Sequence, residues 1–256
     1  MPAHHRTKHA VNQNIEIIEL DQADSTNNRI RQLAEDGQAR NMTVVTAQYQ
    51  TAGRGQVGNS WESEAGKNLL MSVLVEHRDL DVHQQFYFSK AVSVSLVETL
   101  DGIVKDTRIK WPNDIYHADR KLAGILIEND LCRSEIRRSI VGIGLNVNQM
   151  RFVSDAPNPV SLRQITGRDH DMREIVGTFV GNLQRWKSCV DEKDFASIDR
   201  QYFARLYRNV GMHAFADSRG RFMARIEGIA PEGFLVLRDA DDVQRSYAFK
   251  EVEFII

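Results

Sequence analysis

The residues with the clearest capacity for chemistry lie in one glycine-rich stretch, residues 48–72, which reads QYQTAGRGQVGNSWESEAGKNLLMS. Closely spaced glycines let a backbone bend and bring its N–H groups near an anion. Arg54 adds a planar cation that can grip phosphate oxygens, and Trp61 adds a flat apolar face. A connecting segment of this length without its own secondary structure is usually functional or disordered. The stretch is therefore a candidate site for a phosphate-bearing ligand.

A second segment, residues 107–129, supplies another cation on a predicted strand. Lys121 opens that strand, and Gly124 lies inside it, where a glycine often marks the close approach of a ligand or of another backbone. Most lysines are solvated, so Lys121 is either an exposed strand-edge residue or a fixed cation aimed at a phosphate or carboxylate. Asn113 and Asp114 form a turn pair before the strand.

Small polar residues precede a predicted helix that runs to Gly37. Ser25 or Thr26 would cap the helix, and Gly37 would end it. Such residues are normally only caps, but a helix N-terminus also offers free N–H groups and hydroxyls to a polar ligand. Asn146, at the end of a later strand, has the same two interpretations: the start of a turn, or a side chain that faces a site.

The surrounding pattern predicts an α/β region followed by a small all-β region. Apolar patterning predicts strands over 15–20, 42–47, 68–75, 108–111, 115–116, 122–127 and 135–147, and helices over 86–100, 171–187 and 195–206. From residue 210 short β-like runs alternate with glycine turns, which is typical of a small antiparallel barrel. We therefore expect a flexible tail over 1–14, one domain over 15–209 and another over 210–256.

Composition narrows the class of protein. The chain has 256 residues, of which 42% are hydrophobic and 27% charged, which suits one large globular domain or one with a small appendage. Its formal net charge of −2 lacks the basic balance typical of a nucleic-acid binder. Cys132 and Cys189 are isolated, as expected of reduced residues in a cytoplasmic protein. No apolar run reaches the length of a membrane span, and the polar N-terminus does not resemble a secretory signal.

Several common catalytic motifs are missing from the sequence. It contains no GxxxxGK[ST] or GxGxxG loop, no GxSxG elbow, and no HExxH or EF-hand pattern. The remaining residue set suits the binding of a small polar molecule together with a phosphate. It also suits acyl or phosphoryl activation without a covalent protein nucleophile. Residue types and spacing alone do not identify the substrate.

Four blocks in order resemble the biotin protein ligases, the biotin–[acetyl-CoA-carboxylase] ligase family. They are DSTN at 24–27, QYQTAGRGQVGNSW at 48–61, KWPND at 110–114 with RKLAGILIE at 120–128, and VGIGLNVN at 141–148. The resemblance spans residues 15–256. It implies an α+β fold in which a mixed-sheet catalytic domain of the class II synthetase-like, biotin/lipoate ligase type precedes a small SH3-like β-barrel.

The same resemblance implies a reaction in two halves. Biotin and Mg²⁺-ATP would give biotinyl-5′-AMP and pyrophosphate, and one lysine of a biotin carboxyl carrier domain would then attack the adenylate. ATP, Mg²⁺ and biotin are the implied cofactors and substrate, and the carrier domain is the implied partner. Repressor members of the family carry an N-terminal DNA-binding domain for which this chain lacks the length, so we expect no DNA partner. We also expect no membrane partner and a cytoplasmic location, and the resemblance leaves a homodimer open.

Site residues follow from the matching positions. Lys121 and Arg54 would be catalytic, with both cations converging on one phosphorus. The biotin-binding residues would be Ser25, Thr26, Asn27, Gln48, Gly53, Gly55, Gln56, Lys121 and Gly124, with Gln48 on the ureido group. The ATP and adenylate residues would be Arg54, Gly58, Trp61, Asn113, Asp114 and Asn146. No direct metal ligand is expected beyond Asp114, because ATP would carry the Mg²⁺.

Two departures and two alternatives accompany this resemblance. Gln56 and Val57 stand where many members carry arginine, which predicts weaker retention of the adenylate. A lipoate–protein ligase of related fold is one alternative, against which Gln48 and the KWPND block favour biotin. A non-catalytic biotin or adenylate sensor is the other, against which intact Arg54 and Lys121 favour an enzyme.

Overall fold

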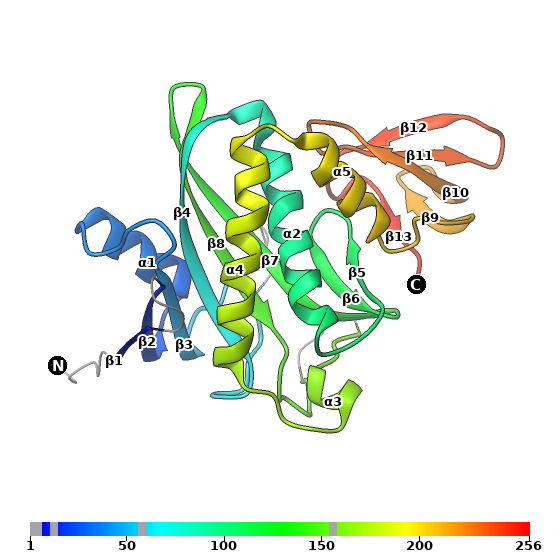
Figure 1. Cartoon of the computed structure of the whole chain (residues 1–256). Coiled ribbons are helices and arrows are strands. Elements are labelled where there is room, and N and C mark those ends of the chain that lie inside the picture. Colours follow the sequence, from blue (N-terminus) through cyan, green and yellow to red (C-terminus); the bar gives the residue numbers. More distant parts are fainter. Residues whose placement is uncertain (1–6, 11–14, 56–59, 154–157) are drawn as a thin grey trace.

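A computed structural model describes residues 7–10, 15–55, 60–153 and 158–256. Within these ranges the chain forms two sheets (Figure 1). The larger sheet has the strand order β1-β2-β3-β4-β8-β7-β6-β5. Its strands are β1 (Thr7–Ala10), β2 (Glu16–Ala23), β3 (Val44–Gln50), β4 (Leu69–Asp81), β5 (Thr107–Lys110), β6 (Asp114–His117), β7 (Arg120–Cys132) and β8 (Glu135–Leu145). Strands β2 and β3 are parallel and the other neighbouring pairs are antiparallel, so the sheet is mixed, as expected.

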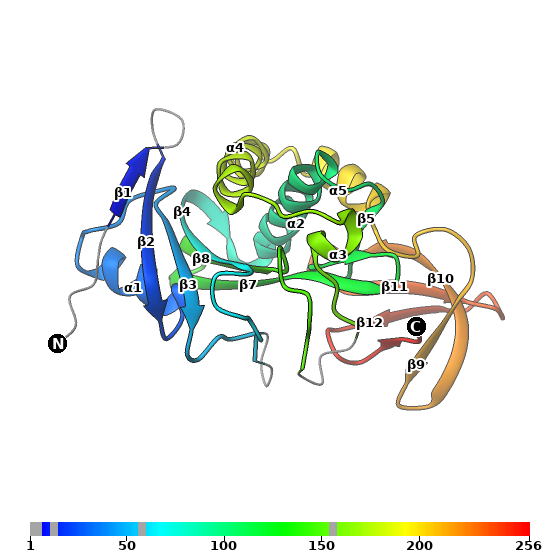
Figure 2. The same ribbon diagram turned by 90° about the horizontal axis from the view of Figure 1, so that it is seen from below.

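Helices cover both faces of the large sheet, as Figure 2 shows. The helices α2 (Gln85–Asp101) and α4 (Met172–Asp191) pack on one face, and α1 (Thr26–Glu35) packs on the other. Residues 69–75 of β4 are all buried, because a strand covered on both faces must be apolar on both. The short helices η1 (Val82–Gln84), α3 (Leu162–Thr166) and α5 (Phe195–Ala204) complete this part of the chain.

Helix α1 connects the two parallel strands and brings its N-terminus to the end of β3. It begins after the N-cap residue Ser25 and ends at Asp36. Gly37 follows with a φ of +67°, a left-handed conformation that glycine adopts without a Cβ penalty. Ile30 and Leu33 are buried against Val45 of β3 and Ile140 of β8. The predicted helix and its glycine stop are therefore confirmed.

The C-terminal sheet has five antiparallel strands in the order β12-β11-β10-β9-β13. They are β9 (His213–Asp217), β10 (Gly220–Ile229), β11 (Leu235–Asp239), β12 (Gln244–Tyr247) and β13 (Glu253–Phe254). Trp111, which follows β5, donates its Nε1–H to the carbonyl oxygen of Gly233 at 2.9 Å, and this bond ties the two sheets together. The α+β class is confirmed, and the domain boundary at residue 209 stays a prediction.

Four residues of the predicted N-terminal tail form a strand. Thr7–Ala10 forms β1, which pairs antiparallel with β2 so that Lys8 lies opposite Ile18. The outer edge of β2 offers unpaired backbone groups that a neighbouring segment can satisfy, and a polar composition does not prevent this pairing. Strand β3 also extends three residues past its predicted end, to Gln50, because it pairs with β2 through Gln22 and Ala23. No helix of the described residues is long and apolar enough to cross a membrane.

Candidate active site

One cavity opens where the N-terminus of α1 meets the ends of β3, β7 and β8. Arg54 and Lys121 both line it, although they are far apart in the sequence. The other lining residues are Ser25, Thr26, Asn27, Gln50, Gly55, Ser60, Trp61, Asp114, Gly124, Ile125, Leu126, Gly142, Ile143, Gly144 and Phe249. The shared cavity that the two cations require therefore exists.

The polar end of the cavity is built at the start of α1. The backbone N–H and the hydroxyl of Thr26 both donate to Oε1 of Gln50, at 2.8 and 3.1 Å. The hydroxyl of Ser72 lies 2.7 Å from Oγ1 of Thr26 and 2.5 Å from Oδ1 of Asn27. Ser25 is 4% exposed and makes no side-chain cap hydrogen bond within the described chain. Its hydroxyl can therefore bind a small polar group.

Gln50, and not Gln48, is the glutamine at this end. Gln48 is exposed and lines a separate hollow with Thr46, His170 and Arg173. Met172 and Val176 of α4 also line that hollow, which shares no lining residue with the cavity of Arg54 and Lys121. The structure thus places Gln50, two positions along the same strand, in the cavity with Arg54 and Lys121, and the assignment of Gln48 to the ureido group stays a prediction.

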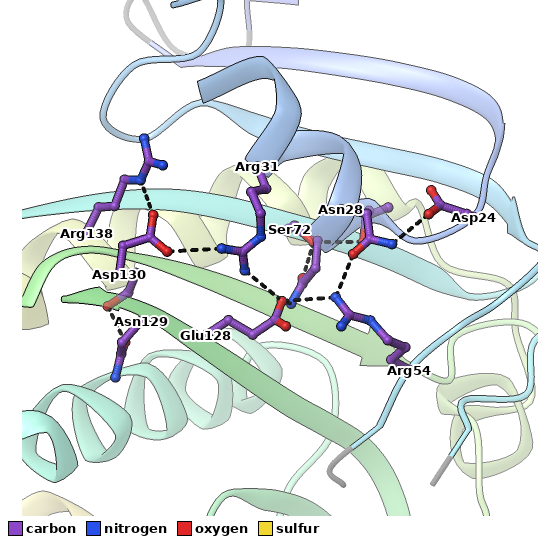
Figure 3. A network of polar contacts seen from close by, with 12 residues as sticks. Asp24, Asn28, Arg31, Arg54, Ser72, Glu128, Asn129, Asp130 and Arg138 are labelled. Atoms are coloured by element: carbon purple, nitrogen blue, oxygen red, sulfur yellow. Dashed lines mark hydrogen bonds and ion pairs between the residues drawn. The ribbon is translucent and has the colours of Figure 1, made fainter. Parts of the chain in front are cut away.

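Arg54 belongs to a network of charged and polar groups between α1 and β7 (Figure 3). Its Nη2 donates to Oδ1 of Asn28 at 2.7 Å and to Oε2 of Glu128 at 3.2 Å. Asn28 in turn donates to Oδ2 of Asp24 at 2.6 Å, and this hydrogen bond lowers the pKa of Asp24 below its usual value. Polar contacts on two sides therefore hold the guanidinium at the rim of the cavity.

Lys121 is held by a carboxylate of its own. Its Nζ lies 2.7 Å from Oδ2 of Asp114 and 6.0 Å from the centre of the Trp61 ring. The backbone on either side is also fixed, because the Lys121 N–H donates to the carbonyl of Asn158 at 2.8 Å and its own carbonyl accepts from Val160 at 2.9 Å. The ammonium thus projects from a rigid strand beside an indole face.

Glycines in β7 and β8 make room for the side chains of the site. A Cβ on Gly144 would lie 2.3 Å from Cε2 of Trp61, and one on Gly124 would lie 3.0 Å from its Cζ3. A Cβ on Gly142 would lie 2.3 Å from Oδ1 of Asn27. Nε1 of Trp61 is buried and has no hydrogen-bond partner in the part of the chain that the structure describes. Buried donors are normally hydrogen-bonded, so an acceptor atom of a bound ligand would satisfy this N–H.

Three other expected site residues lie away from the lining. The carbonyl of Gly53 accepts the N–H of Trp61 at 3.0 Å, so Gly53 closes the base of the loop. Asn146 is buried and donates to the carbonyl of Val160 at 3.1 Å, which places it in a structural role. Asn113 is also buried and does not line the cavity. Gln56 and Gly58, along with Val57, lie outside the described residues.

The structure adds residues that sequence reasoning missed. Phe249, in the turn between β12 and β13, lines the cavity with 46% of its surface exposed, and its ring packs edge-on against Trp111 at 6.0 Å. No sequence signal separates it from the barrel core, because aromatic residues are common in β-strands. Glu128 is the last residue of the RKLAGILIE block. Its place in this motif is the sequence feature that could have pointed to it.

The described lining of the cavity holds little negative charge. Asp114 is the acidic residue among the described lining residues. No group of three or more His, Cys, Asp or Glu that could hold a metal ion occurs in residues 7–10, 15–55, 60–153 and 158–256.

Comparison with known proteins identifies the family. The profile of the biotin/lipoate A/B protein ligase family matches residues 20–146. A biotin–[acetyl-CoA-carboxylase] ligase of Paracoccus denitrificans is 30% identical over 228 residues, which cover 86% of this chain and 92% of that protein. The bifunctional ligase/repressor BirA of Bacillus spizizenii is 28% identical over 245 residues, covering 91% of this chain and 72% of BirA.

A solved structure agrees in fold. The biotin protein ligase from Aquifex aeolicus in complex with biotin and ATP superposes with a TM-score of 0.75 and 24% sequence identity, over 93% of this chain and 97% of that chain. Together with the relatives above, this shared architecture leads to one conclusion: the chain belongs to the biotin/lipoate A/B protein ligase family of enzymes.

Proposed function

We propose that this ligase uses ATP to attach biotin to one lysine of a biotin carboxyl carrier domain, through biotinyl-5′-AMP. The observation that carries the proposal is the single cavity that holds Arg54 and Lys121 together with the polar end at Ser25, Thr26 and Gln50. The name of the Paracoccus denitrificans relative supports the choice of acid and acceptor.

The two ends of the cavity suit the two ends of biotin. Its ureido group needs both hydrogen-bond donors and acceptors, which Ser25 and Gln50 offer. Its apolar body suits the wall made by Trp61, Ile143 and Gly144. Its carboxylate would then extend toward Lys121, which satisfies the rule that a buried charge needs a partner.

The first step joins two negatively charged groups. A carboxylate oxygen of biotin bonds to the α-phosphorus of ATP, and pyrophosphate leaves with the electrons of the broken P–O bond. Arg54 and Lys121 would offset the charge repulsion and stabilise the negative charge that develops on the phosphoryl oxygens. The loss of one such contact typically costs about 2–4 kcal/mol at the transition state.

The second step transfers the acyl group. The amine of the carrier lysine attacks the acyl carbon of the adenylate, AMP leaves with the bonding electrons, and the amine loses a proton. The mixed anhydride must stay dry until then, because water competes with the lysine. The side chains of Trp61 and Arg54 line the cavity in which the adenylate would lie.

Magnesium fits the donor set of the site. Mg²⁺ is commonly bound through one or two carboxylates plus substrate phosphates, and Asp114 lies beside Lys121 in the cavity. Asp114 would hold the ion, which would supply charge neutralisation on the phosphate oxygens of ATP.

The decisive experiment is mass spectrometry of a biotin carrier domain after incubation with the protein, biotin and Mg²⁺-ATP. We expect a mass increase of one biotin on one lysine. The Lys121→Ala variant should lower the rate by about 10²-fold or more and remain folded by circular dichroism. Lys105→Ala is the matched control, because Lys105 is exposed and contacts the carbonyl of Asp101.

Three outcomes would contradict the proposal. Pyrophosphate release with lipoate but not with biotin would make the chain a lipoate ligase. Tight biotin binding without pyrophosphate release or labelling would make it a sensor. An unchanged transfer rate in Lys121→Ala would show that this lysine does not contact the reacting groups.

A further inference from the structure

One carboxylate oxygen beside the cavity contacts donor groups from two separate segments of the chain. Oε2 of Glu128 accepts from Nδ2 of Asn27 at 2.7 Å and from Nη2 of Arg54 at 3.2 Å, and it lies 3.4 Å from Nη2 of Arg31. Asn27 and Arg31 come from α1, whereas Arg54 comes from the glycine-rich stretch; Figure 3 shows the Arg31 and Arg54 contacts to Glu128. The Glu128 side chain is 24% exposed, so these contacts form in a partly desolvated environment where charged hydrogen bonds strengthen.

The position of Glu128 follows from its strand. Gly124 and Leu126 line the cavity, and Glu128 follows on the same face of β7, because side chains alternate along a strand. At this position β7 pairs with β8, where Glu128 lies opposite Ile140, so the carboxylate projects from a hydrogen-bonded strand.

Arg54 is anchored in a way that leaves part of its guanidinium available. Across the described residues, its hydrogen bonds to Asn28 and Glu128 both use Nη2. The Nη1 and Nε donors therefore remain for an anion in the cavity. A guanidinium presents five donors in a fixed plane, so anchoring one nitrogen orients the whole group. A preoriented cation loses less conformational freedom when it binds its ligand.

We propose that Glu128 is a positioning residue that holds Arg54 for the phosphates of the nucleotide. This inference rests on the proposed function for the identity of the anion. Glu128 acts through Arg54 and does not itself contact the substrate. It also holds Asn27, whose Oδ1 lies 2.5 Å from the hydroxyl of Ser72, so one carboxylate fixes both the arginine and the start of α1.

Asp130 provides a matched control two residues further along β7. It accepts from Nη1 of Arg31 at 3.0 Å and also binds Arg138. Asp130 thus shares Arg31 with Glu128 but lies on the far side of Arg31 from Arg54 (Figure 3). The Asp130→Asn variant removes a nearby negative charge without touching the anchor of Arg54.

Two quantities test the inference: the affinity for inorganic pyrophosphate, measured by calorimetry, and the rate of biotin-dependent exchange of pyrophosphate into ATP. Both are measured in Glu128→Gln, Asp130→Asn, Arg54→Ala and the double variant Arg54→Ala/Glu128→Gln. We expect Glu128→Gln to weaken pyrophosphate binding about tenfold, the worth of a hydrogen bond to a charged group, and to raise the KM for ATP in the same proportion. Asp130→Asn should stay within about twofold. Since residues that act as one unit are not additive, the double variant should match Arg54→Ala.

Other results would overturn the inference. Unchanged or tighter pyrophosphate binding in Glu128→Gln would mean that Glu128 does not position Arg54, or that it competes with the anion for it. A Glu128→Gln loss that persists in full on the Arg54→Ala background would mean a purely structural role, as would an equal loss in Asp130→Asn. Absence of pyrophosphate binding by the unaltered protein would also overturn it. Absence of biotin-dependent exchange alone would contradict the proposed function, and the pyrophosphate affinities would still decide the role of Glu128.

Discussion

The indole of Trp61 lies so close to the backbone of Gly144 that a Cβ there would be 2.3 Å from Cε2 and 2.6 Å from Nε1. The ring thus rests on strand β8 where the strand has no side chain, and it forms one wall of the cavity. The absence of a side chain at Gly144 of the VGIGLNVN block is needed for this packing.

Gly144→Ala should move Trp61 out of the cavity wall. Overpacking of this kind typically costs about 1–3 kcal/mol, which urea denaturation would measure, and pyrophosphate exchange should fall with it. Gly181→Ala is the control, because a Cβ on Gly181 of α4 meets nothing within 4 Å. That variant should be neutral or more stable by up to about 1 kcal/mol, because alanine is the better helix former. Equal stabilities for the two variants would show that the indole does not pack on this strand.

The two glutamines of β3 should differ in their effect on biotin. Gln50→Ala should raise the KM for biotin about tenfold or more, since it removes a half-buried hydrogen-bonding partner and leaves the two Thr26 donors unpaired. Gln48→Ala should stay within about twofold, because its side chain lines the separate hollow beside His170 and Arg173. Steady-state kinetics with biotin as the varied substrate would compare them. The reverse order of effects would restore Gln48 as the ureido contact.

Phe249 should affect ATP binding in the cavity although it lies in the turn between β12 and β13. Phe249→Ala removes an aromatic wall next to Asp114 and Lys121, so the KM for ATP should rise about five- to tenfold, the worth of an aromatic contact of roughly 1 kcal/mol or slightly more. Phe234→Ala is the matched control, because Phe234 is also exposed, at 41%, and does not line the cavity. Indistinguishable kinetics for the two variants would remove Phe249 from the site.

His77, which lies outside the candidate active site, should make the free energy of unfolding depend on pH. Burial lowers the pKa of His77 from 6.5 to about 4, with a smaller contribution from Lys187. Its Nε2 lies 2.8 Å from the Ser139 hydroxyl and its ring packs edge-on against Phe88. Because the unfolded chain binds the proton first, the stability that the neutral ring provides is complete above pH 6.5 and falls as the pH drops toward 4.

The measurement is the free energy of unfolding between pH 4 and pH 7. His77 should contribute a loss of at most about 3 kcal/mol over that range. His77→Gln keeps a hydrogen-bonding group for Ser139 but cannot gain the proton, so its stability should fall less steeply with decreasing pH. Parallel curves for the two proteins would show that His77 is protonated equally in the folded and unfolded chain.

The sequence by itself determined the local elements and the chemical inventory of this protein. Helix α1 could be predicted from its apolar spacing and from Gly37, whose left-handed φ follows from glycine chemistry. The cations Arg54 and Lys121 and the glycines around them could be read as anion-binding residues from their types. These features depend on neighbours a few positions away, and local propensity and side-chain periodicity decide them.

Only the tertiary structure decided which side chains meet. Asn27 and Glu128 are 101 positions apart, and Phe249 reaches the cavity from the turn between β12 and β13. Gln48 and Gln50 are the same residue type two positions apart, yet only Gln50 lies at the N-terminus of α1. Strand pairing, the turn of the chain at each strand end, and the packing of α1 set these relations. No local pattern encodes them, because each depends on the position of a partner from a distant part of the chain.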